Sequence, residues 1–244
     1  MSQHTSPAPG NLSVRLQQPA IYFALAFIVA MVGFWPSFFS KLATTDAAHL
    51  IHGVSATLWM AIPILQAWLA SCGRFAVHRR IGRIALLLAP VLVLSALHMV
   101  QLMIVRFEQT HALRLLKFAF LDLTALTLFV VFLGLALWSI RHRDVAAHKR
   151  YMACTVLFAL EPALERVFVF YVPGVSGFEN ALYLALISME IILAVLLLLD
   201  WRRERRVSVA FAASLVFFLA IHVLVTPVAT SSAFRVFALR FAAG

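Results

Sequence analysis

The chain has 244 residues, of which 63% are hydrophobic and only 12% are charged, and its mean hydropathy is +0.95. These values exclude a soluble globular domain, because such a domain needs charged surface on every side. The net charge of +10 does not indicate nucleic-acid binding, because the Lys and Arg residues cluster at the ends of apolar segments. We therefore predict a membrane protein whose main partner is the lipid bilayer, with no nucleic-acid partner.

The first 20 residues form a polar, proline-containing tail that lacks the apolar run and cleavage site of a signal peptide. Seven apolar segments follow, and each is long enough to cross a hydrocarbon core of about 30 Å as a helix. They are residues 21–39, 47–70, 84–105, 118–140, 151–172, 181–199 and 207–229. No alternation typical of a β-barrel appears. We predict an all-α integral membrane protein with one seven-helix domain at residues 21–229 and a short tail at 230–244.

The loops predict an orientation for these helices. Of the 20 Lys and Arg residues, 13 fall in the N-terminal tail and in the loops after the second, fourth and sixth segments. Six fall on the other side, and Arg166 lies within the fifth segment. Because cytoplasmic loops carry an excess of Lys and Arg, we predict a bacterial inner-membrane protein with a cytoplasmic N-terminus and a periplasmic C-terminus.

The fifth segment is unusual because it carries Glu161, Glu165 and Arg166 among apolar residues. A charged side chain at the centre of a bilayer costs about 2.5–3.5 kcal/mol on insertion scales. A helix that keeps three such groups within six residues must turn them toward partners or water. We therefore predict that this helix lies in the interior of the bundle.

Two histidine motifs resemble each other at the cytoplasmic side, and they predict a cofactor site. His78-Arg79-Arg80 precedes the third segment and His148-Lys149-Arg150 precedes the fifth. A b-type haem in a bundle needs two neutral imidazoles from different helices, apolar walls and cationic groups for the propionates. The sequence predicts that His78 and His148 are one axial pair, with propionates held by Arg79, Arg80 and Arg150. The alternative is that both histidines are ordinary headgroup anchors.

A second histidine level is predicted in the periplasmic half, at about 1.5 Å of depth per residue. His52, His98 and His222 could share this level, and His111 lies just beyond it. The second axial pair would be His52 with His98 or His111. The candidate iron ligands are His52, His78, His98 and His148. The alternative for His98 and His222 is a neutral imidazole bonded to a serine or a main-chain carbonyl.

The intramembrane acids predict a different chemistry. They are Asp122, Glu161, Glu165 and Glu190. With His98 or His222 they could bind non-haem iron or manganese, since mixed carboxylate and imidazole sites suit these metals in helical bundles. The alternative is a network without a cofactor, in which Arg166 offsets one acid and the other acids stay neutral. A neutral glutamate on such a helix could also relay protons in a transporter.

The motif regions resemble a known family. His78-Arg79-Arg80-Ile81-Gly82-Arg83 and Arg143-Asp144-Val145-Ala146-Ala147-His148-Lys149-Arg150-Tyr151-Met152, followed by Arg166, resemble a family of uncharacterised bacterial multi-pass membrane proteins. That family implies a fold but no activity. More distantly, the layout is similar to the two-haem b-type cytochromes, which are ascorbate-dependent transmembrane reductases. Those place an axial histidine on each of four consecutive helices, alternating between membrane sides. The resemblance implies His52, His78, His111 and His148 for these roles.

Three functions remain open from the sequence. The leading hypothesis is haem-b-mediated electron transfer, with a quinone or another small lipid-soluble redox partner. The second is a transporter or proton-coupled carrier that uses Glu161, Glu165, Arg166 and Glu190. The third is a metal-dependent membrane enzyme that acts on a lipid-soluble substrate through the same acids with His98 and His222.

Overall fold

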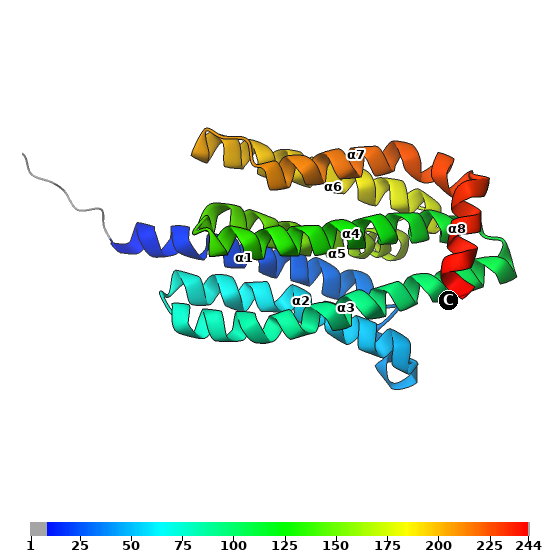
Figure 1. The fold of residues 1–244 in the computed structure, drawn as a ribbon, viewed down its shortest axis with the longest axis horizontal. Coiled ribbons are helices and arrows are strands. Elements are labelled where there is room, and N and C mark those ends of the chain that lie inside the picture. The colour runs from blue at the N-terminus through cyan, green and yellow to red at the C-terminus, as the bar shows by residue number, and fades with distance from the viewer. Residues whose placement is uncertain (1–8, 244) are drawn as a thin grey trace, which may run out of the picture.

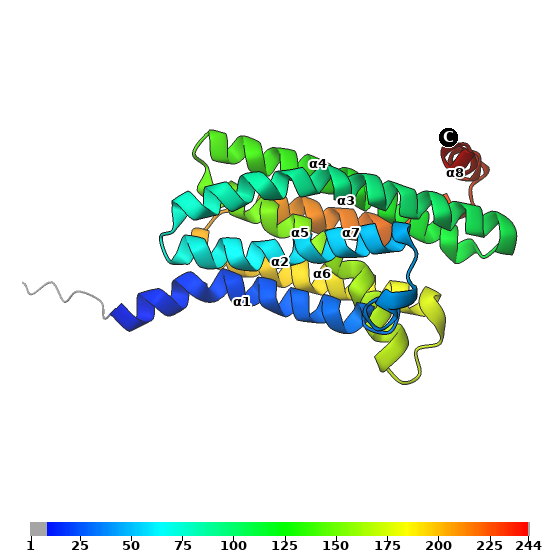
Figure 2. The ribbon, with the colours of Figure 1, turned by 90° about the horizontal axis from the view of Figure 1, so that it is seen from below.

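The computed structural model describes residues 9–243, with side chains from residue 19 onward, and every regular element in that range is a helix. The helices are α1 (Pro9–Phe34), the short 3₁₀ helix η1 (Phe39–Thr44), α2 (Ala47–Ser71), α3 (Phe75–Thr110), α4 (Leu113–Arg141), α5 (Val145–Tyr171), α6 (Gly177–Glu204), α7 (Val209–Thr230) and α8 (Ser232–Ala243). Helices α1 to α7 lie side by side along the long axis, and α8 crosses one end of the bundle (Figures 1 and 2).

Five of these helices are long and apolar enough to cross a membrane: α2, α3, α4, α6 and α7. The bundle also turns large apolar side chains outward. Leu87 on α3 is 72% exposed and Val223 on α7 is 71% exposed. Exposed apolar surface on this scale is typical of a protein that contacts lipid. The prediction of an all-α membrane protein is confirmed at this level.

Helix α5 lies at the centre of the bundle, as its charged residues predict. It contacts α1, α2, α4, α6 and α7. Glu161 and Glu165 are 3% and 4% exposed, respectively. The same charged residues make α5 less apolar than the other long helices, which explains its absence from the five apolar spans. The buried glutamates face other helices rather than lipid.

Several helix ends differ from those expected from hydropathy. Helix α3 begins at Phe75, well before the predicted start at residue 84, so His78 lies inside the helix. Helix α1 ends at Phe34 because a proline at position 36 disfavours helical backbone in the residue before it. Residues 9–20, predicted as part of the tail, belong to α1, while residues 1–8 lie outside the described range. Within the predicted C-terminal tail, Ser232–Ala243 forms α8.

Three exposed tryptophans mark one end of the bundle. They lie in the last turns of α2, α4 and α6, and they are Trp68, Trp138 and Trp201, respectively. At this end of the bundle the turns between paired helices lie together (Figure 1). Each ring contacts a cation or imidazole in the turn that follows: Arg74 for Trp68 at 5.7 Å, His142 for Trp138 at 4.3 Å and Arg205 for Trp201 at 5.8 Å. Tryptophan and arginine gather where a membrane meets water, so this basic end lies at one membrane surface.

The contact between α1 and α5 depends on a glycine. A Cβ atom added at Gly33 would overlap the carbonyl oxygen of Ala163 and lie 3.1 Å from its carbonyl carbon. Ala163 is fully buried, and the Tyr171 hydroxyl donates to the Val32 carbonyl at 3.2 Å nearby. The two backbones approach closely because neither helix carries a large side chain at this point.

Candidate functional site

The hairpins α2–α3 and α4–α5 turn in the same way. In the first, the backbone N–H groups of Cys72, Gly73, Arg74 and His78 donate to the carbonyls of Trp68, Ala70, Leu69 and Arg74, respectively. In the second, those of His142, Arg143, Asp144 and His148 donate to Trp138, Ile140, Ser139 and Asp144. Gly73 and Arg143 both have a positive φ, at 70° and 64°. The shared geometry places His78 and His148 at equivalent positions.

Both histidines are held in the same way by the preceding helix. The Nδ1 atom of His78 lies 3.1 Å from the main-chain oxygen of Gln66, and that of His148 lies 2.9 Å from the main-chain oxygen of Ala136. Because a carbonyl only accepts, this contact favours a proton on Nδ1 of His148. The Nδ1 atom of His78 also lies 2.7 Å from the side-chain amide of Gln66, which can donate to it. Among the described residues no hydrogen bond reaches either Nε2. A histidine that binds a metal through one nitrogen is usually oriented in this way by the other.

The two rings belong to opposite corners of a four-helix ring. Helix α2 contacts α3 and α5, and α4 also contacts α3 and α5, so α3 and α5 lie diagonally across the interior. His78 and His148 are partly buried, and each donates its backbone N–H to the residue four positions earlier, directly after its hairpin turn. Both therefore lie at the same end of the bundle.

Free space lies beside His78. A Cβ atom added at Gly82, one turn later on α3, would meet only the Oε1 atom of Gln66, at 4.0 Å. This contrasts with Gly33, where a Cβ would strike backbone. Room for at least a methyl group is therefore present at this glycine.

The arginines of the two motifs differ in their partners. Arg150 donates through Nε and Nη2 to the Oδ1 atom of Asp200 on α6, at 3.0 and 2.8 Å. Its Nη2 atom also lies 3.9 Å from Glu204. Arg79 and Arg80 are exposed. Arg150 thus ties α5 to α6, and Arg79 and Arg80 remain as the cations for a ligand beside His78.

Asp200 is a residue whose role the sequence analysis missed. It sits near the cytoplasmic end of a long apolar run, and only its position opposite a basic motif could have suggested an ion pair. Its other oxygen, Oδ2, is buried and has no partner among the described residues. Replacing Asp200 with alanine is expected to destabilise the protein by about 1–3 kcal/mol, since it leaves the partly buried guanidinium with only the more distant Glu204 carboxylate. Thermal unfolding in detergent measures this, and the double variant with Arg150→Leu should recover most of the loss.

The histidines predicted for the periplasmic half are not assembled in the same way. The His52 Nδ1 atom lies 3.2 Å from the Ser95 hydroxyl on α3. His98 is exposed, lies 3.4 Å from the Gln101 amide oxygen on its own helix, and lines a hollow of about 270 Å³ between α2 and α3. His111 is exposed and ends α3 with a left-handed backbone, at φ 53°. Among the described residues no contact joins His98 or His111 to His52.

The acids of α5 form a mixed cluster with residues of neighbouring helices. The Oε1 atoms of Glu161 and Glu165 are buried and have no partner in the described part of the chain. Asp122 of α4 and Arg166 lie close enough to act electrostatically on both carboxyls. The Arg166 Nη1 atom donates to the Pro162 carbonyl at 2.8 Å, and its guanidinium lies 4.4 Å over the Phe34 ring.

Glu190 and His222 form a separate pair. The His222 Nδ1 atom lies 2.8 Å from the Glu190 carboxylate, which joins α7 to α6. The His222 ring lies 5.7 Å from Tyr183. The polar network predicted as one set is therefore divided into an α4–α5 cluster and an α6–α7 pair. Within residues 9–243, no group of three or more His, Cys, Asp or Glu side chains has a geometry that could hold a metal ion.

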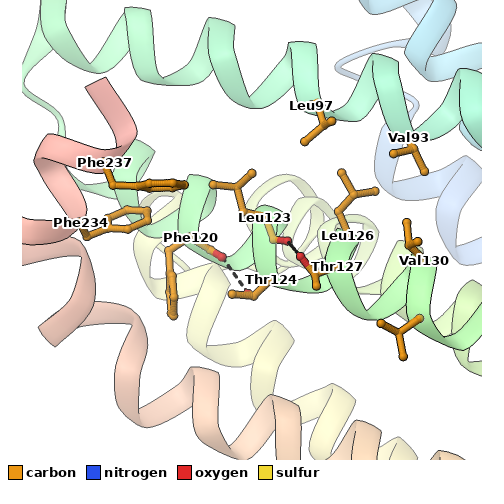
Figure 3. A pocket seen from close by; sticks show the side chains of 11 residues that line it. Val93, Leu97, Phe120, Leu123, Thr124, Leu126, Thr127, Val130, Phe234 and Phe237 are labelled. Carbon is orange, nitrogen blue, oxygen red and sulfur yellow. Dashed lines mark hydrogen bonds between the residues drawn. The ribbon is translucent and has the colours of Figure 1, made fainter. Parts of the chain in front are cut away.

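An apolar groove of about 610 Å³ opens on the outside of α3 and α4 (Figure 3). Phe234 and Phe237 of α8 lie at one end of it. Its polar atoms belong to Thr124 and Thr127, whose hydroxyls donate to the Phe120 and Leu123 carbonyls at 2.7 and 2.8 Å. With both donors already used, the groove suits a hydrocarbon chain rather than a ligand that needs hydrogen-bond donors.

No family model matches this chain, and neither curated proteins nor solved structures provide a significant match.

Proposed function

We propose that the chain binds one b-type haem between His78 and His148 and passes electrons through it at the cytoplasmic side of a bacterial inner membrane. The observation that carries the proposal is the matched placement of the two imidazoles. Each has Nδ1 held by a main-chain carbonyl of the preceding helix, and each has Nε2 without a hydrogen bond among the described residues. Bis-imidazole ligation of haem iron requires two such rings from different helices.

The residues around this pair fit the group. The carbonyls of Gln66 and Ala136 orient the rings and raise the basicity of their free nitrogens. Gly82 leaves room beside His78, and the exposed Arg79 and Arg80 provide charge for two propionates. When bound, a haem supplies one-electron redox chemistry. A quinone or another lipid-soluble molecule is the proposed redox partner, since such a molecule reaches the protein from the bilayer.

The proposal includes seven membrane spans with a cytoplasmic N-terminus and a periplasmic C-terminus. Helices α1 and α5 are the two spans beyond the five apolar ones. The apolar part of α1, Pro19–Phe34, is about 24 Å long, so this span would need flanking residues to cross the whole hydrocarbon core. The charges of α5 face other helices, and the basic end with its three tryptophans supports the cytoplasmic assignment.

An absorption spectrum tests the haem site. Protein expressed with haem precursor and purified from membranes should show a Soret band and, after reduction with dithionite, a sharpened α band. His78→Ala and His148→Ala should each lose this low-spin spectrum, because each removes one axial ligand. His142→Ala is the matched control, since this exposed histidine of the same membrane face stacks on Trp138 and should be dispensable.

Two results would overturn the proposal. The first is a colourless protein after expression with ample haem precursor. The second is an unchanged spectrum in both His78→Ala and His148→Ala, which would place any bound haem elsewhere.

A further inference from the structure

The α4–α5 cluster has more acids than bases. Asp122, Glu161 and Glu165 provide three carboxyls, and Arg166 is the one cation that acts on all of them. Uncompensated charge in hydrocarbon is costly, so two of the three carboxyls must be neutralised. Since no group of three metal-ligating side chains is present among the described residues, protons are the neutralising species that the cluster fits.

Two buried carboxyl oxygens in the cluster have no hydrogen-bond partner among the described residues. The Oε1 atoms of Glu161 and Glu165 have none among the described residues, although both side chains are more than nine-tenths buried. The buried Trp59 indole nitrogen on α2 also has no partner there. Buried polar atoms are nearly always hydrogen-bonded, so such orphans indicate that a proton or water occupies the cluster during function.

Polar groups on α2 connect this cluster to the bundle end that carries α8. At the surface, the His49 ring lies 2.7 Å from the Asp46 carboxylate. One turn deeper, His52 bonds to Ser95. At the helical rise per residue, His52 lies about 8 Å below this end of α2, and Glu161 lies about 15 Å below the same end of α5. His52 therefore stands between an exposed histidine and the buried cluster.

The opposite direction is closed by apolar side chains. Trp59 lies about 10 Å deeper than His52 at the helical rise per residue. It packs on Phe129 with ring centroids 5.0 Å apart, and Leu157 and Phe158 are buried in the same core. The polar side chains buried on this side, Thr155 and Ser214, donate to the main-chain carbonyls of Met152 and Ala210.

Other titratable groups near α5 already have partners. On α6 and α7, Glu190 and His222 bind each other. Lys117 on α4 donates to Glu179 of α6. The part of α1 whose side chains are described, residues 19–34, contains no charged residue. The groups that act electrostatically on the α5 carboxyls are therefore Asp122 of α4 and Arg166 of α5. His52 of α2 lies nearer the surface, bonded to Ser95.

We propose that Asp122, Glu161, Glu165 and Arg166 form an intramembrane proton-binding site that exchanges protons through His52 and His49 with the end of the bundle opposite the basic turns. A proton from water at that end passes to the imidazole of His49, then to His52, and then to a carboxylate oxygen of the cluster. The site rests on different residues from the haem site and stands without it.

Infrared spectroscopy of the full chain in lipid vesicles tests the bound protons. The carbonyl stretch of a neutral carboxylic acid should be present near neutral pH. Glu161→Gln and Glu165→Gln should each weaken it. Glu190→Gln is the matched control, because that carboxyl is intramembrane but paired with His222, and the signal should persist. If the signal survives in both cluster variants at full strength, the proposal is wrong.

The path is tested by exchange kinetics with every carboxyl left in place. His52→Leu should slow the shift of the neutral carboxyl band after transfer to heavy water by about a hundredfold, the low end of what a positioned acid–base group contributes. His98→Leu is the control, since that exposed ring lies on the outer side of α3. Equal exchange rates in His52→Leu and wild type would overturn the path. Both variants should keep the haem spectrum, so this outcome is independent of the electron-transfer proposal.

Discussion

Gly33→Leu is expected to prevent stable packing of α1 on the bundle. The new side chain would start inside the space of the Ala163 carbonyl, which is backbone of a central helix and cannot rotate away. Overpacking of a well-packed core costs about 1–3 kcal/mol where side chains can shift, and more where they cannot. We expect a loss above about 3 kcal/mol, seen as a much lower unfolding temperature and yield of monodisperse protein in detergent.

Gly134→Leu is the matched control for this prediction. Gly134 lies on α4, is exposed, and has no atom within 4 Å of an added Cβ. The control should unfold at the wild-type temperature, because its side chain would project into lipid or detergent. Equal stability of Gly33→Leu and wild type would show that α1 does not approach α5 as closely as described.

Gly82→Leu is expected to abolish haem binding while leaving the fold intact. The space beside His78 accepts a Cβ atom with only the Gln66 oxygen at 4.0 Å, but a leucine would fill it. Gly82→Ala should therefore keep the spectrum, and Gly82→Leu should lower haem affinity by at least about tenfold, a loss typical of altered surroundings of a metal ligand.

Haem content per protein and unfolding temperature, measured on the same preparations, separate the two effects. The expected result is an unchanged unfolding temperature of the haem-free protein with a lost Soret band in Gly82→Leu alone. Full haem content in Gly82→Leu would mean that the cofactor does not lie along this face of α3.

The depth of a side chain along its helix could be predicted from the sequence. The direction in which that side chain points around the helix axis could not. Hydropathy and charge placed α5 in the interior, and the structure shows it there. They also predicted that His78 and His148 lie at the same end of the bundle, where the two hairpin turns place them. Hydropathy could not show that His52 turns toward Ser95 while His98 turns outward. The rotation of a helix about its axis is set by packing contacts with distant segments, such as Gly33 against Ala163.

The sequence also could not show which charged side chains form ion pairs with one another. Arg150 matches Arg80 in the repeated motif, yet it binds Asp200 because α6 lies beside α5 and not beside α3. Glu190 and His222 pair because α6 and α7 are neighbours, which separates them from the acids of α5. A single sequence predicts which side chains are polar, but it does not show which helices are adjacent.

Helix α8 has a practical consequence for mapping the chain with reporter fusions. Its 12 residues extend about 18 Å, which is too short for a hydrocarbon core of about 30 Å. It lies across the bundle end, where the Gln101 amide donates to the Phe241 carbonyl at 3.2 Å and Arg235 lies 5.5 Å over Phe107. An enzyme tag joined after Thr230 and one joined after Ala243 will therefore report the same compartment.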